Sequence, residues 1–298
     1  MNDGIERIAN ISYADFQREY AQQHRPVILT EATNDWPARE WTPRTLAERF
    51  GDRMVTINER SDHASEMPLR DYVELASRLP ERTGPWEWRA GTGPDSPPYM
   101  RGLFLWRFSP ELLREVVVLP YFLPNWLNRD SFRTLAMGEP IWVDLFMGSP
   151  GASFPSFHYD RGRTHNWFCQ IYGTKHFWVA ANDQARFLRD ADGKIIDTFP
   201  APADRYPEAH RAKVVEFDLR PGEVLFIPSG LWHTTKTHML NISVSGNFVN
   251  GTNVDAYLTE LKLAETAWRR VKAGSIVGLN RVLDRLEGEP TFLVWEIV

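Results

Sequence analysis

Residues 153–178, "SFPSFHYDRGRTHNWFCQIYGTKHFW", concentrate side chains that can bind a metal ion, including three of the eight histidines of the chain. Residues two apart in an extended segment point to the same side, so His158 and Asp160 are expected to project together. His233, after the turn-and-strand sequence "GEVLFIPSGLW", could supply a second imidazole. Two imidazoles and one carboxylate on one face of an ion leave its other positions open, which is the ligand set of mononuclear non-haem Fe(II) oxygenases. The three residues therefore predict such a site, although a His-x-Asp pair alone is more often a hydrogen-bonded surface couple.

A lysine stands on the strand-like sequence that follows. Lys175 belongs to "GTKHFWV". Its neighbours are aromatic and apolar, so a side chain that faces solvent poorly explains a lysine at this position. A buried ammonium needs an anion beside it. Lys175 could therefore bind an anionic ligand, for example the distal carboxylate of a dicarboxylic acid whose 2-oxo acid end chelates the metal, although the spacing alone does not show this. His165 and His176 are expected to be hydrogen-bonded neighbours rather than further ligands, because the metal needs open positions, and His238 is expected in a loop.

The composition is that of an ordinary globular protein. Of 298 residues, 43% are hydrophobic and 24% are charged, and the net charge of −5 gives no reason to expect nucleic acid or an anionic membrane as a partner. The single cysteine, Cys169, excludes an internal disulfide, fits a reducing compartment and is expected to be a buried small hydrophobe. The first residues show no signal-peptide pattern, and no apolar run reaches membrane-spanning length. We therefore expect a cytoplasmic protein.

The elements that must position these residues follow from the spacing of apolar side chains. Residues 12–23 and 42–52 predict capped helices, and residues 167–181 predict two strands joined at Tyr172-Gly173-Thr174. In "LNISVSGNFVN" (240–250), apolar and polar residues alternate strictly, so the polar face, which carries Ser245 and Asn247, is expected to face the barrel interior. Residues 186–213 are polar and proline-containing and are interpreted as an inserted loop.

The pattern after Thr252 is helical. One stripe runs through Tyr257, Leu261, Ala264, Trp268 and Val271, and a second runs from Ile276 to Leu286 between two glycines, Gly274 and Gly288. Two amphipathic helices at a terminus could pack on their own domain, which is the commoner arrangement, or on a second subunit.

With these motifs in order, the chain resembles the Jumonji C (JmjC) family, which are cupin-like Fe(II)- and 2-oxoglutarate-dependent oxygenases. The resemblance rests on "FHYD", "NWFCQIYGTKHFWV", "RPGEVLFIPSGLWHTT" and "NISVSGNF", together with the upstream "RPVILTEATNDWPAREWTPRTLAERFGD". It covers roughly residues 11–250, and within the family the chain looks closest to the asparaginyl hydroxylase that inhibits hypoxia-inducible factor. In the family, C-terminal helices often form a dimer.

The resemblance implies roles for individual residues. It places His158, Asp160 and His233 on iron, and Lys175 on the C5 carboxylate of 2-oxoglutarate with assistance from Tyr99 in "PPYMRGL". It also implies that the co-substrate pocket is lined by Asn166, Asn247 and Phe168.

The chain departs from the family pattern in two places. The segment "RGRTH" between Asp160 and Asn166 is two residues longer than usual, which makes Arg161, Arg163 and His165 specific to this branch. Pro155 stands where the family often has a threonine or serine that binds 2-oxoglutarate. Because proline has no hydrogen to donate, the role could pass to one of three residues, namely Ser156, Thr164 or Ser245.

The resemblance and the strand pattern together predict a mainly β protein. The expected fold is a double-stranded β-helix (a jelly-roll or cupin barrel) with flanking helices, organised as an oxygenase domain over residues 1–252 and C-terminal helices over 253–298. The implied reaction uses Fe(II), 2-oxoglutarate and O₂ and hydroxylates a C–H bond of a peptide or protein side chain, or of a small metabolite, while 2-oxoglutarate becomes succinate. Two alternatives stay open: a cupin-like binding or sensor protein without turnover, and a metal-cupin reaction that uses no 2-oxoglutarate, against which Lys175 and Tyr99 argue. We expect no nucleic-acid or membrane partner and a possible homodimer.

Overall fold

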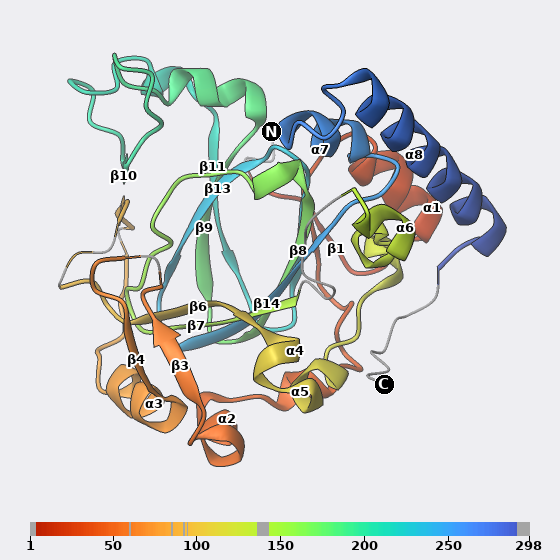
Figure 1. Cartoon of the computed structure of the whole chain (residues 1–298). Helices are drawn as coiled ribbons and strands as arrows, with labels where there is room; N and C mark the ends of the chain where they lie inside the picture. Colours follow the sequence, from red (N-terminus) through yellow and green to blue (C-terminus); the bar gives the residue numbers. More distant parts are fainter. Residues whose placement is uncertain are drawn as a thin grey trace.

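Two β-sheets form the centre of the computed structural model, which describes residues 4–59, 61–84, 86–91, 93, 95–135 and 143–290 (Figure 1). The larger sheet has the strand order β1-β2-β12-β8-β14-β7-β6, and the smaller has the order β11-β9-β13. The pairing is antiparallel throughout both sheets except between β1 and β2. The predicted jelly-roll architecture, mainly β with flanking helices, is confirmed.

The strands of the larger sheet are β1 (Arg7–Ile8), β2 (Val27–Leu29), β6 (Tyr99–Phe104), β7 (Val143–Gly148), β8 (His165–Tyr172), β12 (Val224–Ile227) and β14 (Asn241–Phe248). Those of the smaller sheet are β9 (Lys175–Ala180), β11 (Val214–Leu219) and β13 (Trp232–Thr237). Two further pairs are β3 (Met54–Ile57) with β4 (Ser65–Pro68), and β5 (Trp88–Arg89) with β10 (Thr198–Phe199).

The α-helices are α1 (Tyr13–Phe16), α2 (Pro43–Phe50), α3 (Leu69–Ser77), α4 (Leu105–Phe108), α5 (Pro110–Arg114), α6 (Asp130–Arg133), α7 (Val254–Glu260) and α8 (Ala267–Glu287). A π-helical turn (Gln17–Ala21) continues α1, so the predicted helix over 12–23 forms with two hydrogen-bond patterns. Short 3₁₀ turns span Pro37–Glu40, Pro120–Phe122, Trp126–Asn128, Arg161–Arg163, Asn182–Phe187 and Ala209–Arg211. None of the helices within the described part of the chain combines the length and the apolar character that crossing a bilayer requires.

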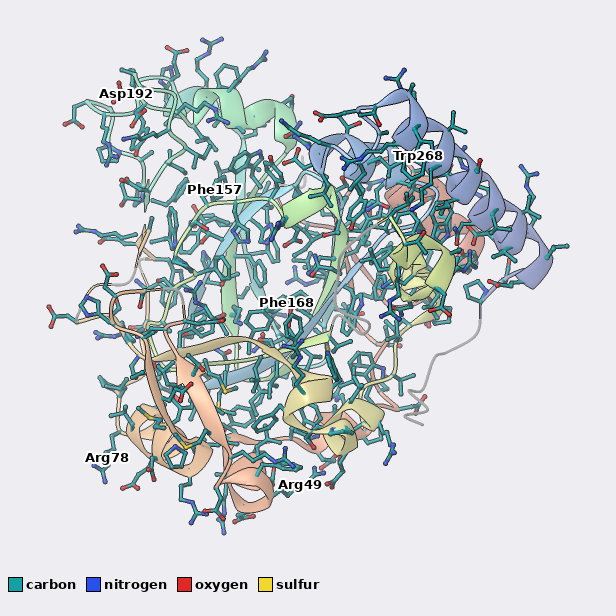
Figure 2. All side chains as sticks on the ribbon, in the orientation of Figure 1. Arg49, Arg78, Phe157, Phe168, Asp192 and Trp268 are labelled. Atoms are coloured by element: carbon teal, nitrogen blue, oxygen red, sulfur yellow. The ribbon has the colours of Figure 1, made fainter. Side chains whose placement is uncertain are left out.

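The larger sheet is buried on both faces, which decides where its polar residues can go. Cys169 and Val244 face outward, into a core shared with Phe16, Trp36 and other residues of the N-terminal elements. The alternate residues face inward, where Phe168 on β8 meets Phe177 on β9 with ring centroids 5.4 Å apart. Figure 2 shows Phe168 among the strands at the centre of the molecule. The apolar residues of β14 fill the outer core, so its alternate polar residues project into the barrel, as the alternation predicts.

Two sequence-based boundaries are wrong. The sequence "GEVLFIPSGLWHTT" predicts a turn, a strand and a second turn, but Trp232–Thr237 at its end forms β13 and pairs with β9 along its whole length. The second C-terminal helix was expected to be bounded at Gly274, yet α8 is continuous through Gly274 and Gly278. A helix tolerates an internal glycine at a cost of about 1 kcal/mol, which tertiary packing can offset.

The C-terminal helices pack against the 126–133 segment. Tyr257, Ala273 and Val277 are buried against Trp126 and Phe132. The predicted stripes differ from this buried set, because Trp268, Val271 and Leu286 are exposed. The predicted boundary between residues 252 and 253 stays a prediction.

The turn between β8 and β9 depends on a glycine. Gly173 has φ +69°, and a Cβ there would lie 2.8 Å from the carbonyl oxygen of Leu240. Gly193 shares the left-handed conformation, with φ +78°, but a Cβ there would meet nothing within 4 Å.

We therefore expect Gly173→Ala to lower the free energy of unfolding by about 1–3 kcal/mol more than Gly193→Ala does, because only Gly173→Ala adds a steric clash to the conformational cost. Urea denaturation of both variants measures the difference. Equal losses would show that the close approach to Leu240 does not constrain the turn.

Candidate active site

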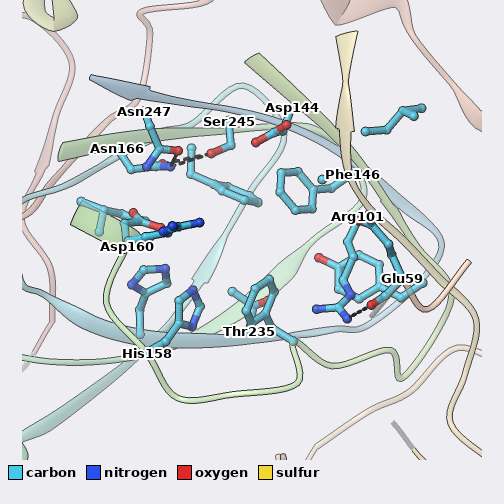
Figure 3. A pocket seen from close by; sticks show the side chains of 18 of the residues that line it. Glu59, Arg101, Asp144, Phe146, His158, Asp160, Asn166, Thr235, Ser245 and Asn247 are labelled. Atoms are coloured by element: carbon cyan, nitrogen blue, oxygen red, sulfur yellow. Dashed lines mark hydrogen bonds between the residues drawn. The ribbon is translucent and has the colours of Figure 1, made fainter. Parts of the chain in front are cut away.

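His158, Asp160 and His233 lie together inside the barrel, and the ligand atoms that they offer are all within 4.8 Å of one another. Backbone pairing produces this convergence. His158 forms an antiparallel bridge with His233, in which the His158 N–H donates to the His233 carbonyl at 3.0 Å and the reverse bond is 2.6 Å. The two imidazole centroids are consequently 4.4 Å apart. Figure 3 shows His158 beside Asp160.

The two histidines are held in the tautomer that a metal requires. Nδ1 of His158 lies 3.1 Å from the carbonyl oxygen of Ser156, and Nδ1 of His233 lies 3.1 Å from that of Leu231. A carbonyl can only accept, so each Nδ1 carries the proton and each Nε2 presents a lone pair. Burial, and secondarily His233, lower the pKa of His158 to about 3, which keeps this imidazole neutral.

Asp160 is half-buried, and one oxygen of its carboxylate is buried without a partner in the described part of the chain. Within the described residues its Oδ2 has no hydrogen-bond partner, and burial raises the pKa of Asp160 against the opposing effects of His233 and Asn247. An orphaned buried carboxylate oxygen is costly unless a cation meets it. Two imidazoles whose Nδ1 atoms face backbone carbonyls, together with this carboxylate, fit a divalent iron bound on one face.

Aromatic stacking orients the first ligand. The Phe154 ring lies parallel to the His158 imidazole, with centroids 4.4 Å apart and planes at 16°. The Arg101 guanidinium lies 5.6 Å from the centroid of the same Phe154 ring, and Arg101 also donates to the carbonyl of Glu59. The sequence analysis did not single out Phe154 or Glu59, and no motif pointed to them.

A cavity of about 480 Å³ opens beside the three ligands. This volume suits a small co-substrate together with part of a second molecule. The predicted pocket residues Tyr99, Asn166, Phe168, Ser245 and Asn247 all line it. Charged residues contributed by other segments also line it, namely Glu59, Arg101, Arg107, Asp144 and Arg161.

Lys175 is fully buried among the aromatic residues that line this cavity. Its ammonium lies 4.7 Å from the Phe168 centroid and 5.7 Å from the Phe146 centroid, and it donates to the Tyr99 hydroxyl at 3.3 Å. Burial lowers the pKa of Lys175 to about 7, and no carboxylate within the described residues offsets this effect. A desolvated ammonium beside one hydroxyl can accept an anionic ligand.

Thr235 is a pocket residue that the sequence analysis missed. It lies on β13 two residues after His233, so its side chain shares the inward face and lines the cavity. Burial raises the pKa of Tyr99, and a hydrogen-bonding contribution from Thr235 opposes that rise. Of the three candidates to compensate for Pro155, only Ser245 lines the cavity, whereas Ser156 and Thr164 do not. The alternation of residues in "WHTTKT" could have indicated Thr235 if β13 had been recognised as a strand.

The predicted asparagines form one hydrogen-bonded network with Ser245. The Asn166 amide donates to Ser245 at 2.8 Å and to the Asn247 carbonyl oxygen at 3.0 Å, and Asn247 donates to Thr164 at 2.6 Å. Thr164 therefore orients Asn247 from outside the cavity. The network leaves Asn166, Ser245 and Asn247 as a polar wall opposite the histidines (Figure 3).

The residues of the longer "RGRTH" segment lie in different environments. Arg161 lines the cavity, whereas Arg163 forms an ion pair of 3.3 Å with Glu260 on α7. His165 is buried, accepts from the Ser229 N–H at 2.9 Å and contacts the Thr252 hydroxyl at 2.8 Å, so it is the expected hydrogen-bonded neighbour. Burial lowers the pKa of His165 well below its usual range.

A family described as "Cupin-like domain" matches residues 13–253. The chain is 28% identical over 273 residues to the 2-oxoglutarate and iron-dependent oxygenase JMJD4 of Gallus gallus, covering 85% of this chain and 61% of that protein. It is 29% identical over 269 residues to JMJD4 of Homo sapiens, covering 82% of this chain and 60% of that protein.

A third relative carries a different name. The chain is 28% identical over 264 residues to the lysine-specific demethylase JMJ21 of Arabidopsis thaliana, covering 85% of this chain and 26% of that protein. The chain thus spans from 26% to 61% of the length of these three relatives.

The buried ammonium makes the stability of the ligand-free protein pH-dependent. Burial depresses the pKa of Lys175 to about 7, whereas an unfolded lysine titrates near ~10.4. Between these values the unfolded chain binds a proton that the folded chain has released, so the Lys175 contribution to stability rises with pH. We expect Lys175→Met to be more stable than the wild type by several kcal/mol near pH ~6, with the difference shrinking from pH ~7 to ~10.

Urea unfolding across this pH range measures the effect, and Lys213→Met, at an exposed lysine, is the control that should show no such trend. A difference between wild type and Lys175→Met that does not change with pH would contradict the desolvation of Lys175.

Proposed function

Because this chain belongs to the cupin-like domain family, with homologues named as 2-oxoglutarate and iron-dependent oxygenases, we propose that it is itself an Fe(II)- and 2-oxoglutarate-dependent dioxygenase. The observation that carries the proposal is the buried ammonium of Lys175 in the same barrel as the His158–Asp160–His233 triad. A dicarboxylic 2-oxo acid has the two ends that these two groups require. The balanced reaction converts 2-oxoglutarate, O₂ and R–H to succinate, CO₂ and R–OH.

The residues of the chain divide the binding work between them. Nε2 of each histidine and the Asp160 carboxylate would hold iron, which when bound supplies the electrons and the coordination positions for activating O₂. Lys175, Tyr99 and Thr235 would bind the C5 carboxylate, with Thr235 acting where Pro155 cannot donate. The aromatic rings of Phe146 and Phe168 keep water away from the ammonium, which strengthens its attraction for the carboxylate.

The polar wall would orient the second substrate or the co-substrate. Asn166, Ser245 and Asn247 are already hydrogen-bonded to one another, so their orientation costs little on binding. The charged residues Glu59, Arg107 and Arg161 line the same cavity and suit a polar substrate. A binding or sensor protein without turnover is not favoured, because the relatives reported above carry the names of enzymes.

The substrate that we propose is a side chain of a peptide or protein. Support comes from the name of one relative as a lysine-specific demethylase, and from a cavity that carries carboxylates as well as guanidinium groups. A small metabolite is the competing outcome, and succinate release in the presence of peptide pools or metabolite pools separates the two. The particular closeness to the asparaginyl hydroxylase, and the cytoplasmic location, stay predictions.

For the reaction itself, we expect Fe(II), ascorbate and 2-oxoglutarate to give slow succinate formation without a second substrate, and His158→Ala to abolish it. Thr235→Val should raise the KM for 2-oxoglutarate about 10-fold or more with a smaller change in kcat, because a hydrogen bond to a charged group contributes about 1.5–3 kcal/mol. His210→Ala, an exposed histidine in the 186–213 loop, should match the wild type. Metal binding without succinate under every condition would overturn the proposed function.

We also propose that α8 pairs with a second copy of the chain. Trp268, Val271, Leu279, Val282 and Leu286 are 48–78% exposed and follow one side of the helix at spacings of three and four residues and their multiples. Figure 2 shows Trp268 on the outer side of α8. Such a stripe is the pattern by which helices of separate subunits pack.

Light scattering should accordingly give the mass of two chains for the wild type and of one chain for the double variant Trp268→Asp/Leu286→Asp. The control Met54→Asp introduces an aspartate at an exposed apolar residue on β3, which is distant in sequence from α8. This variant should still have the mass of two chains. A wild-type mass of one chain would rule out the dimer.

A further inference from the structure

A second group of two histidines and a carboxylate lies on the outer face of the smaller sheet. His176 follows Lys175 on β9, and because neighbouring strand residues point to opposite faces, His176 points out of the barrel. Asp218 on β11 is the register partner of His176, and His238 follows the last residue of β13. The ligand atoms of the three residues lie within 4.8 Å of one another. Three adjacent segments thus deliver one side chain each to the same point.

The contacts within this group converge on one oxygen. Nδ1 of His176 lies 2.8 Å and Nε2 of His238 lies 2.9 Å from Oδ1 of Asp218. The other ring nitrogen of His176 lies 3.4 Å from the carboxylate of Glu216. A neutral imidazole has only one N–H and cannot donate to both carboxylates. Two carboxylates around two imidazoles therefore favour the binding of a cation between them.

Aromatic side chains hold both imidazoles in place and leave the acids accessible. The Trp86 ring lies edge-on to His238 with centroids 3.9 Å apart, and Trp178 lies edge-on to His176 at 4.4 Å. The side chains of His176 and His238 are 8% and 19% exposed, whereas that of Asp218 is 42% exposed. Lys236, the register partner of His176 on β13, donates to the Glu87 carbonyl at 2.6 Å and so has a partner of its own.

From this geometry we propose that His176, Asp218 and His238 form a second metal site, separate from the iron site and suited to Zn²⁺. Zinc is bound by histidine nitrogens and carboxylate oxygens in tetrahedral geometry, and the exposed side of Asp218 leaves room for water as a fourth ligand. The bound ion would join β9, β11 and the connection after β13. The ion would thereby stabilise β9, which carries Lys175, from its outer face. Binding of the ion does not depend on the proposed oxygenase activity.

Isothermal titration calorimetry, in which Zn²⁺ is added to the metal-free, full-length protein, tests this inference. We expect two binding events for the wild type, and one remaining event for the double variant His158→Ala/His233→Ala, which removes two of the three iron ligands. Asp218→Asn keeps an oxygen that can accept from both histidines but loses the charge, so a purely structural network would be preserved. We expect this variant to bind Zn²⁺ at the second site at least about 10-fold more weakly.

Two controls make the result decisive. His210→Ala removes an exposed histidine that belongs to neither group and should leave both binding events unchanged. Co²⁺ titrated into His158→Ala/His233→Ala should give the visible absorption of a tetrahedral nitrogen–oxygen site, and Asp218→Asn added to that background should remove it. If the double variant binds no Zn²⁺, or if Asp218→Asn binds it as tightly as the wild type, the cluster is a hydrogen-bonded network and the inference is wrong.

Discussion

The desolvation of charged groups inside the barrel is the constraint on which the structure depends. Lys175 is buried and Asp160 is half-buried, and burial lowers the pKa of Lys175 and raises that of Asp160, so that it favours the neutral form of each. The free protein satisfies neither group fully, since Lys175 meets the Tyr99 hydroxyl and Asp160 keeps an oxygen without a partner within the described residues. A cation at one position and an anion at the other would remove both costs. The same burial that destabilises the free protein therefore supplies affinity for its ligands.

The architecture creates this interior by covering the larger sheet on its outer face. N-terminal helices and 3₁₀ turns pack against Cys169, Val244 and their neighbours, so the polar residues that alternate with these on β8 and β14 point toward the barrel axis. Pairing of residues 153–158 with β13 then sets His158 opposite His233. The position of the metal ligands is thus a consequence of sheet register, and the tautomer of each histidine is a consequence of the backbone carbonyls two residues before it.

β9 connects the two polar clusters of the molecule. Lys175 faces the barrel and His176 faces outward, so one strand carries the buried lysine on one side and a member of the second histidine–aspartate group on the other. The turn at Gly173 begins this strand and lies against Leu240 at the start of β14. Any rearrangement of β9 would consequently move side chains of both clusters.

The sequence by itself determined the order of the motifs and the chemistry that they can perform. The spacing of His158 and Asp160, the lysine among aromatic residues and the strict alternation of residues 240–250 depend on local geometry, because strand periodicity is a property of neighbouring residues. The jelly-roll fold and the inward polar face of β14 followed from that local information and from family resemblance.

Only the tertiary structure decided which distant residues meet. Thr235 reaches Tyr99, and His238 joins His176 and Asp218, through pairings between different strands. Such contacts depend on register and on which face is buried, and no sequence window contains both partners. Helix α8 passed through Gly274 for a related reason, since packing against Trp126 and Phe132 outweighs the local preference of glycine.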